Sequence, residues 1–109
     1  MEVHIAPGLP ARLAQAEDLR RFSVIAAAGP DALPDLAAAL QGVLAFEGTG
    51  HAWVAVDWLL SASGQAGSEA WRTGFEAMRA YAAKQGWTRD DPPALRGHVA
   101  WQAAAPARR

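Results

Sequence analysis

The chain has 109 residues and a formal net charge of −1, and 51% of its residues are hydrophobic. This composition fits one globular domain with a buried core and excludes a disordered chain. The near-neutral charge argues against nucleic acid or an anionic membrane as the partner of the whole chain, and the absence of cysteine excludes disulfides and thiolate chemistry.

The sequence also indicates where in the cell the protein is expected to be found. The first ten residues, MEVHIAPGLP, lack the basic region and the apolar run of a signal peptide. No stretch reaches the roughly 18 apolar residues that a membrane-spanning helix needs. We therefore expect a soluble cytoplasmic protein. Alanine is abundant and arginine outnumbers lysine, which is typical of GC-rich bacterial genomes.

The first part of the chain predicts a strand, a helix and a second strand. Residues 2–5 alternate polar and apolar side chains, as a short strand does. Residues 10–19, PARLAQAEDL, are good helix formers. Residues 21–27 alternate again and contain β-branched side chains, which favours a strand. The rival interpretation is one helix over residues 10–28.

A second helix is predicted after the Gly29-Pro30 break. Asp31 is suited to its N-cap, because its carboxylate can accept a free backbone N–H of the first turn. The apolar stripe of this helix comprises Leu33, Leu36, Leu40 and either Val43 or Leu44. Residues 45–49 then read as a loop that leads into a glycine-containing turn.

The next segment admits two interpretations. Residues 51–55, HAWVA, predict a strand. Asp57 then favours a short helix over residues 58–62, ended by Gly64, because aspartate is depleted within strands and preferred at caps. The alternative is that the strand continues to residue 60.

The clearest helix covers residues 68–84. Ser68 is a good N-cap, and Gly86 reads as a left-handed residue just past the helix end. The buried stripe has the 3.6-residue period of an amphipathic helix and comprises Trp71, Phe75, Met78 and Ala82. Trp87 can fold back onto this stripe.

The C-terminal part predicts a loop over residues 88–93 and a strand over residues 95–102, whose alternation is the cleanest in the chain. We expect one globular domain over residues 1–102 and a flexible tail over residues 103–109.

This order of elements indicates an α/β fold, with α+β not excluded. The expected form is a two-layer sandwich of three or four strands with helices packed mainly on one face. Several strands keep a polar alternate side, which argues against helices on both faces of the sheet.

All three histidines, His4, His51 and His98, fall in predicted strands. Three imidazoles on one face can bind zinc, but the local spacings of metal motifs are missing. We therefore expect half-exposed strand histidines, with no metal and no cofactor. One polar sheet face nevertheless offers a candidate ligand site at His51, Trp53, Arg96 and His98, because histidine and arginine together supply a base and an anion clamp.

Tryptophan is the one compositional excess, with five in the chain. Trp53, Trp58 and Trp87 are not fixed in the core by periodicity, and tryptophan is enriched at contact surfaces. These three are therefore candidate interface residues.

Two acidic features have structural explanations. Glu47, His51 and Asp57 are near one another in sequence and could form a carboxylate–histidine base. However, helix capping by Asp57 and solvation of Glu47 are sufficient explanations. Asp90-Asp91 reads as a solvated turn.

No catalytic, phosphate-binding or nucleotide-binding motif is present. The leading functional hypothesis is therefore a protein-interaction or homodimerising module. The alternative is a small-molecule-binding protein or small enzyme with its site around His51, Arg96 and His98.

Overall fold

The computed structural model describes residues 1–90 and 92–102. The described residues form seven strands: β1 (Glu2–Ala6), β2 (Leu9–Ala14), β3 (Ser23–Ala26), β4 (Leu44–Glu47), β5 (His51–Ala55), β6 (Thr88–Arg89) and β7 (Ala94–Trp101). The helices are a 3₁₀ turn, η1 (Pro30–Ala32), and three α-helices, α1 (Leu33–Ala39), α2 (Val56–Ser63) and α3 (Glu69–Lys84).

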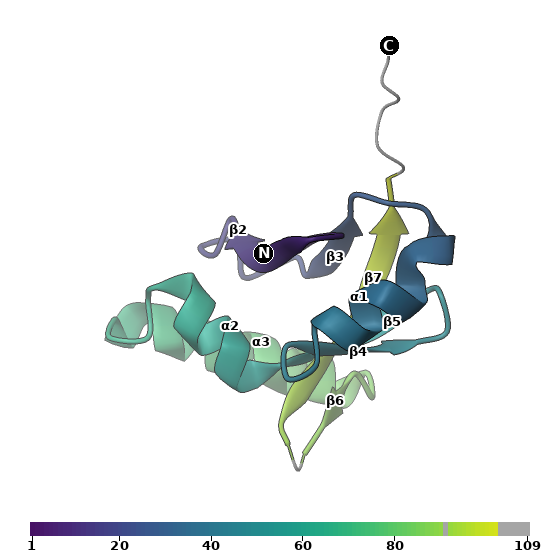
Figure 1. The fold of residues 1–109 in the computed structure, drawn as a ribbon. Helices are drawn as coiled ribbons and strands as arrows, with labels where there is room; N and C mark the ends of the chain where they lie inside the picture. Colours follow the sequence, from purple (N-terminus) through teal and green to yellow (C-terminus); the bar gives the residue numbers. More distant parts are fainter. Residues whose placement is uncertain (91, 103–109) are drawn as a thin grey trace.

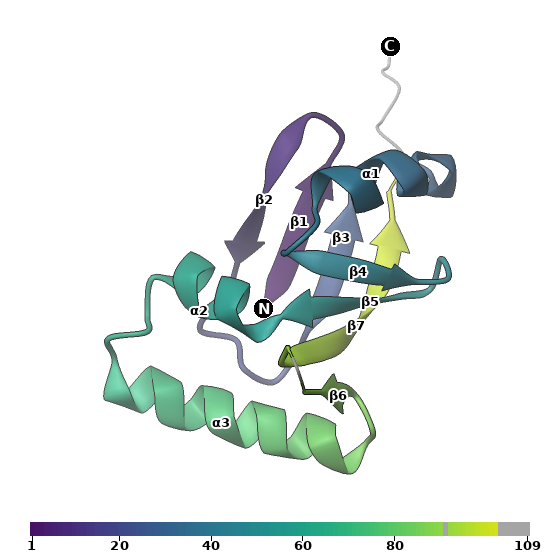
Figure 2. The same cartoon turned by 60° about the horizontal axis from the view of Figure 1, so that its bottom comes forward.

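The strands build one mixed sheet in the order β2-β1-β3-β7-β5-β4, with β6 paired to β7. β1, β3 and β7 run parallel, and the other pairings are antiparallel. The sheet curls, and α1 and α2 lie on its inner side (Figures 1 and 2). The fold is therefore a sheet-dominated α+β arrangement. The expected mixture of strands and helices is confirmed, but the expected three or four strands are too few.

The inner side of the sheet carries the core, because alternate strand residues are buried there. The buried strand residues include Val3, Ile5, Val24, Ala26, Ala52, Val54, Leu95 and Val99. They form one cluster with Leu36 of α1, Leu40 just after that helix, Val56 and Leu59 of α2, and Trp71 and Phe75 of α3. The other alternate residues point to the outer side, where polar and half-buried side chains remain.

The helix predicted over residues 10–19 is wrong, as is the rival helix over residues 10–28. β2 forms there instead and pairs with β1, so that Val3 lies opposite Leu13. Gly8, at a φ of 78°, makes the turn between the two strands. Pairing with β1 outweighs the modest helix propensity of this segment, and Pro10 is tolerated because β2 is an edge strand.

Two predicted elements in the middle of the chain need correction. Asp31 does not cap a helix: Gly29 is the N-cap of η1, without a side-chain hydrogen bond. The expected loop over residues 45–49 contains most of β4, which forms a hairpin with β5 around Gly48 at a φ of 59°. Only four residues long, β4 has too little alternation to separate it from the end of the preceding helix.

Strands β3 and β5 and the short helix α2 are confirmed. Gly64 ends α2 at a φ of 66°, as expected. Asp57 is not its cap: the N-cap is Ala55, and no side-chain hydrogen bond is made there. Asp57 lies in the first turn, where a negative charge suits the positive end of the helix.

The longest helix, α3, is confirmed at both ends. The Ser68 hydroxyl oxygen accepts a hydrogen bond from the Trp71 backbone N–H at 3.2 Å. At the other end the Trp87 N–H donates to the Ala82 carbonyl at 2.9 Å, with Gly86 at a φ of 78°. This Schellman arrangement satisfies the last carbonyls and turns the chain back sharply.

The C-terminal strand β7 is confirmed, and it occupies the centre of the sheet between β3 and β5. The loop expected over residues 88–93 is partly a strand, since Thr88 and Arg89 pair with the start of β7. The expected tail over residues 103–109 lies outside the described residues.

Within the part of the chain that is described, no helix combines the length and apolarity needed to cross a membrane.

Candidate functional site

The four predicted ligand residues lie together on the outer side of the sheet. In the β5–β7 register His51 is opposite His98, and Trp53 is opposite Arg96. Paired residues of neighbouring strands share a face, so all four side chains belong to one patch. The two imidazole rings meet edge to face, with centroids 5.7 Å apart and planes at 81°.

One of these residues, Arg96, forms an ion pair with Glu47 on β4. Arg96 Nε donates to Glu47 Oε1 at 2.6 Å, and Glu47 is opposite His51 in the β4–β5 register. The hydrogen bond from Arg96 lowers the pKa of Glu47 below its usual value. The Trp53 indole N–H also lowers it, at a geometry too loose to count as a hydrogen bond. Glu47 therefore positions Arg96 rather than serving His51 as a base partner.

A cavity of about 230 Å³, here called the helix–sheet cavity, lies where the C-terminal half of α3 meets β7 and the segment before β3. Its charged and polar lining residues are Arg20, Arg21, His51, Arg96 and His98. Its aromatic and apolar lining residues are Phe22, Met78, Tyr81, Ala82, Trp87 and Leu95. Three of the four predicted ligand residues thus line it, and Trp53 does not.

The cavity wall is strongly cationic. It contains three arginines, and among the described residues no aspartate or glutamate lines it. Glu47 offsets part of the charge of Arg96 from outside the wall. An anion is the species that this wall can neutralise, since guanidinium groups present several N–H donors to a carboxylate or phosphate.

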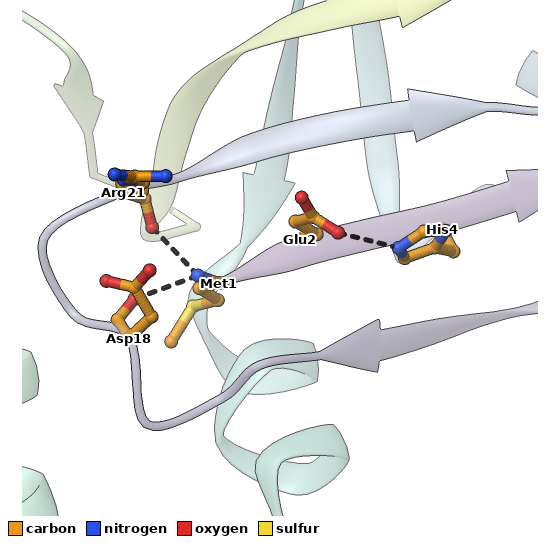
Figure 3. A network of polar contacts seen from close by, with 5 residues as sticks. All are labelled: Met1, Glu2, His4, Asp18 and Arg21. Carbon is orange, nitrogen blue, oxygen red and sulfur yellow. Dashed lines mark hydrogen bonds and ion pairs between the residues drawn. The ribbon is translucent and has the colours of Figure 1, made fainter. Parts of the chain in front are cut away.

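Arg20 and Arg21 are not among the site residues predicted from the sequence. Their segment is held by the Met1 amino group, which donates to the carbonyl oxygens of Asp18 at 2.8 Å and Arg21 at 3.0 Å (Figure 3). Burial lowers the pKa of that amino group. The signal that could have located Arg21 is alternation: counted back from Ser23, it falls on the same strand side as that residue.

An aromatic pair also lines the cavity. Tyr81 and Trp87 lie edge to face, with ring centroids 6.3 Å apart and planes at 68°. Tyr81 is 59% exposed and Trp87 is 39% exposed, so both rings are accessible from solvent. The backbone turn after α3 brings the chain back at Trp87, whose ring contacts Tyr81 of that helix. Trp87 lines the same cavity as Met78 and Ala82 of the predicted stripe.

The other two candidate interface tryptophans lie elsewhere. The Trp53 ring is covered by Arg89, whose guanidinium carbon is 4.1 Å from the ring centroid, a cation–π arrangement. It lines a smaller cavity of about 140 Å³ between β4 and the start of β7. Trp58 on α2 is half-buried and packs against the core. Only Trp87 of the three reaches the helix–sheet cavity.

The remaining candidate groups do not converge. His4 pairs with Glu2 at 3.0 Å on β1, two strands away from β7 (Figure 3). Within residues 1–90 and 92–102, no three His, Cys, Asp or Glu side chains are grouped closely enough to hold a metal ion. Asp57 is exposed on α2. The expected Asp90-Asp91 turn falls partly on residue 91, outside the described residues.

No protein-family model, curated protein or solved structure matches this chain. Its function is therefore inferred from the geometry of the helix–sheet cavity.

Proposed function

We propose that this protein binds a small organic molecule in the helix–sheet cavity. The observation that carries the proposal is the meeting of His51, Arg96 and His98 with the aromatic end of α3 around one cavity of about 230 Å³. Binding sites combine an apolar enclosure with a few converging polar groups, and this cavity has both.

Histidine substitutions test this function. His51→Ala and His98→Ala each remove a side chain that lines the cavity from a position that is not fully buried. The matched control is His4→Ala, which removes a histidine from the outer side of β1, away from the cavity. Ligand binding is followed by amide chemical shifts in a fragment screen, and folding by thermal melting.

The expected result is weaker binding in the two cavity variants, unchanged binding in His4→Ala, and intact folding in all three. Binding that survives both cavity substitutions would place the ligand elsewhere. Loss of folding in His51→Ala or His98→Ala would show that the pair is structural, and conservative substitution to Gln would then separate the two roles.

Self-association is a second candidate function, favoured by a different observation. Ile25 is half-buried on the outer side of the sheet between His4 and Ala100, and neither α1 nor α2 lies on that side (Figures 1 and 2). A homodimer through this face would cover Ile25. Light scattering at high micromolar concentration should then give a dimeric mass that Ile25→Lys reduces to a monomer. A monomeric wild-type chain contradicts this second function.

A cytoplasmic, bacterial setting completes the proposal and is supported by the cysteine-free, alanine-rich composition.

A further inference from the structure

We propose that the ligand of the helix–sheet cavity is an aromatic anion: a single planar ring that carries a carboxylate on a short arm. This inference rests on the proposed binding function and names the class of molecule that the cavity takes.

The charge of the wall selects an anion. Arg20, Arg21 and Arg96 contribute three guanidinium groups. Among the described residues Arg20 and Arg21 make no ion pair, so their guanidinium N–H groups are not used by a carboxylate of the protein. Arg96 uses its Nε for Glu47, which leaves four of its five N–H donors for a ligand. A cation in this cavity would meet no compensating carboxylate on the wall.

The aromatic residues of the lining select a flat ring. Phe22, Tyr81 and Trp87 contribute three aromatic residues to the same lining as the arginines. Aromatic rings prefer offset-stacked or edge-to-face contacts with one another, and the Tyr81–Trp87 pair already has its edge-to-face geometry without a ligand. A planar ring can enter against this preformed pair, whereas a saturated ring of the same size forgoes those contacts.

The volume limits the size of the ligand. About 230 Å³ corresponds to seven or eight water molecules at roughly 30 Å³ each, which is room for on the order of ten non-hydrogen atoms. One ring with a two-carbon acid arm has this size. A nucleotide, with a base, a sugar and a phosphate, exceeds it.

Four matched probes test the class: phenylacetate, 2-phenylethanol, phenethylamine and cyclohexylacetate. They share one six-membered ring and a short arm but differ in charge or in ring flatness. Each is titrated into the full chain, and the amide shifts of Tyr81, Trp87 and Arg96 report binding in the cavity. Phenylacetate should bind about tenfold more tightly than the alcohol, because a charge-assisted hydrogen bond contributes about that factor or more. The amine should bind weakest.

Variants assign the charge preference to the arginines. The double substitution R20Q/R21Q should weaken phenylacetate binding about tenfold and leave 2-phenylethanol unchanged. The control R12Q/R72Q removes the same amount of charge from exposed positions on β2 and α3, away from the cavity, and should change neither affinity by more than about twofold. Equal losses in the two double variants would mean that only net charge matters, which overturns a positioned anion site.

The outcomes separate this inference from the function on which it rests. Binding of all four probes with equal strength at the cavity overturns the aromatic anion and leaves the binding function standing. Cyclohexylacetate binding as tightly as phenylacetate overturns the ring preference. Absence of cavity shifts with every probe, including compounds from the fragment screen, overturns both proposals.

Discussion

His51 on β5 and His98 on β7 lie directly opposite each other, and their rings meet edge to face with centroids 5.7 Å apart. The core sets this position: next to the pair in the ladder, Ala52 lies opposite Gly97 with both residues buried. A shift of one residue would bring the histidines to the inner side of the sheet, which makes their register strongly specified.

Replacing His98 with alanine should cost little stability. His98 is exposed, so the loss is limited to one cross-strand pair, about 0.2–1 kcal/mol in the free energy of unfolding. Urea denaturation measures this difference. A loss well above 2 kcal/mol would mean that the imidazole supports the fold in a way its exposure does not reveal.

Gly97→Ala should destabilise the protein and disturb the cavity. A Cβ atom at this position would lie 2.9 Å from Cε2 and 3.1 Å from Cδ2 of Phe22, whose ring lines the cavity. Overpacking of this kind costs about 1–3 kcal/mol. The double variant G97A/F22L should lose less than the sum of its single variants, because the smaller side chain makes room.

The control for that substitution is Gly67→Ala, where an added Cβ would meet nothing within 4 Å. Its free energy of unfolding should stay within about 0.5 kcal/mol of wild type.

If the stability loss of the double variant G97A/F22L equals the sum of the losses of the two single variants, Gly97 and Phe22 do not interact.

Trp71→Phe should weaken the attachment of α3 to the segment after β2. The Trp71 indole N–H donates to the Ala16 carbonyl at 2.9 Å in a buried setting. Phenylalanine keeps the ring but leaves that carbonyl without its partner, at a cost of about 1–3 kcal/mol. Calorimetry or urea denaturation provides the measurement. A change below about 0.5 kcal/mol would mean that water replaces the indole at Ala16.

Glu47→Gln should change how stability depends on acid. The lowered pKa of Glu47 means that its stabilising contribution is complete above the usual glutamate value of 4.5 and is lost as the pH falls through the lower folded value. Wild type should therefore lose stability in this window relative to the glutamine variant. The difference is followed by denaturation from about pH 6 to about pH 2.

Glu76→Gln is the matched comparison, because Glu76 also pairs with an arginine, Arg79, at 3.0 Å, but within one exposed helix. Such a pair contributes about 0.2–0.5 kcal/mol. Identical acid profiles for wild type and Glu47→Gln would show that the Arg96 pair adds nothing to folding.

Local signals predicted the elements whose pattern is long or whose ends are marked. Ser68 and Gly86 delimit α3 because each makes its backbone contact within one turn of the chain. Alternation located β7 and placed Arg96 and His98 on one side of it, since side-chain direction along a strand follows from the sequence alone. That His51 shares their face follows from the pairing of β5 with β7, which the sequence did not provide.

The sequence did not predict elements that form only because a neighbouring strand pairs with them. The segment forming β2 has helix-forming residues and becomes a strand only because β1 is beside it. The same limit applies to the cavity: Arg20 and Tyr81 are 61 positions apart, and nothing local in either segment indicates that they line one cavity.

The central place of β7 has a consequence for biosynthesis. The β1–β2–β3 group and the β4–β5 hairpin precede β7 in the chain, yet β3 and β5 contact each other in the sheet only through that strand. A ribosome that has not yet released residues 94–101 holds two partial sheets with open edges and no pocket between helix and sheet. Joining the two halves requires long-range pairing, a slow step that leaves strand edges exposed to chaperones and to other nascent chains.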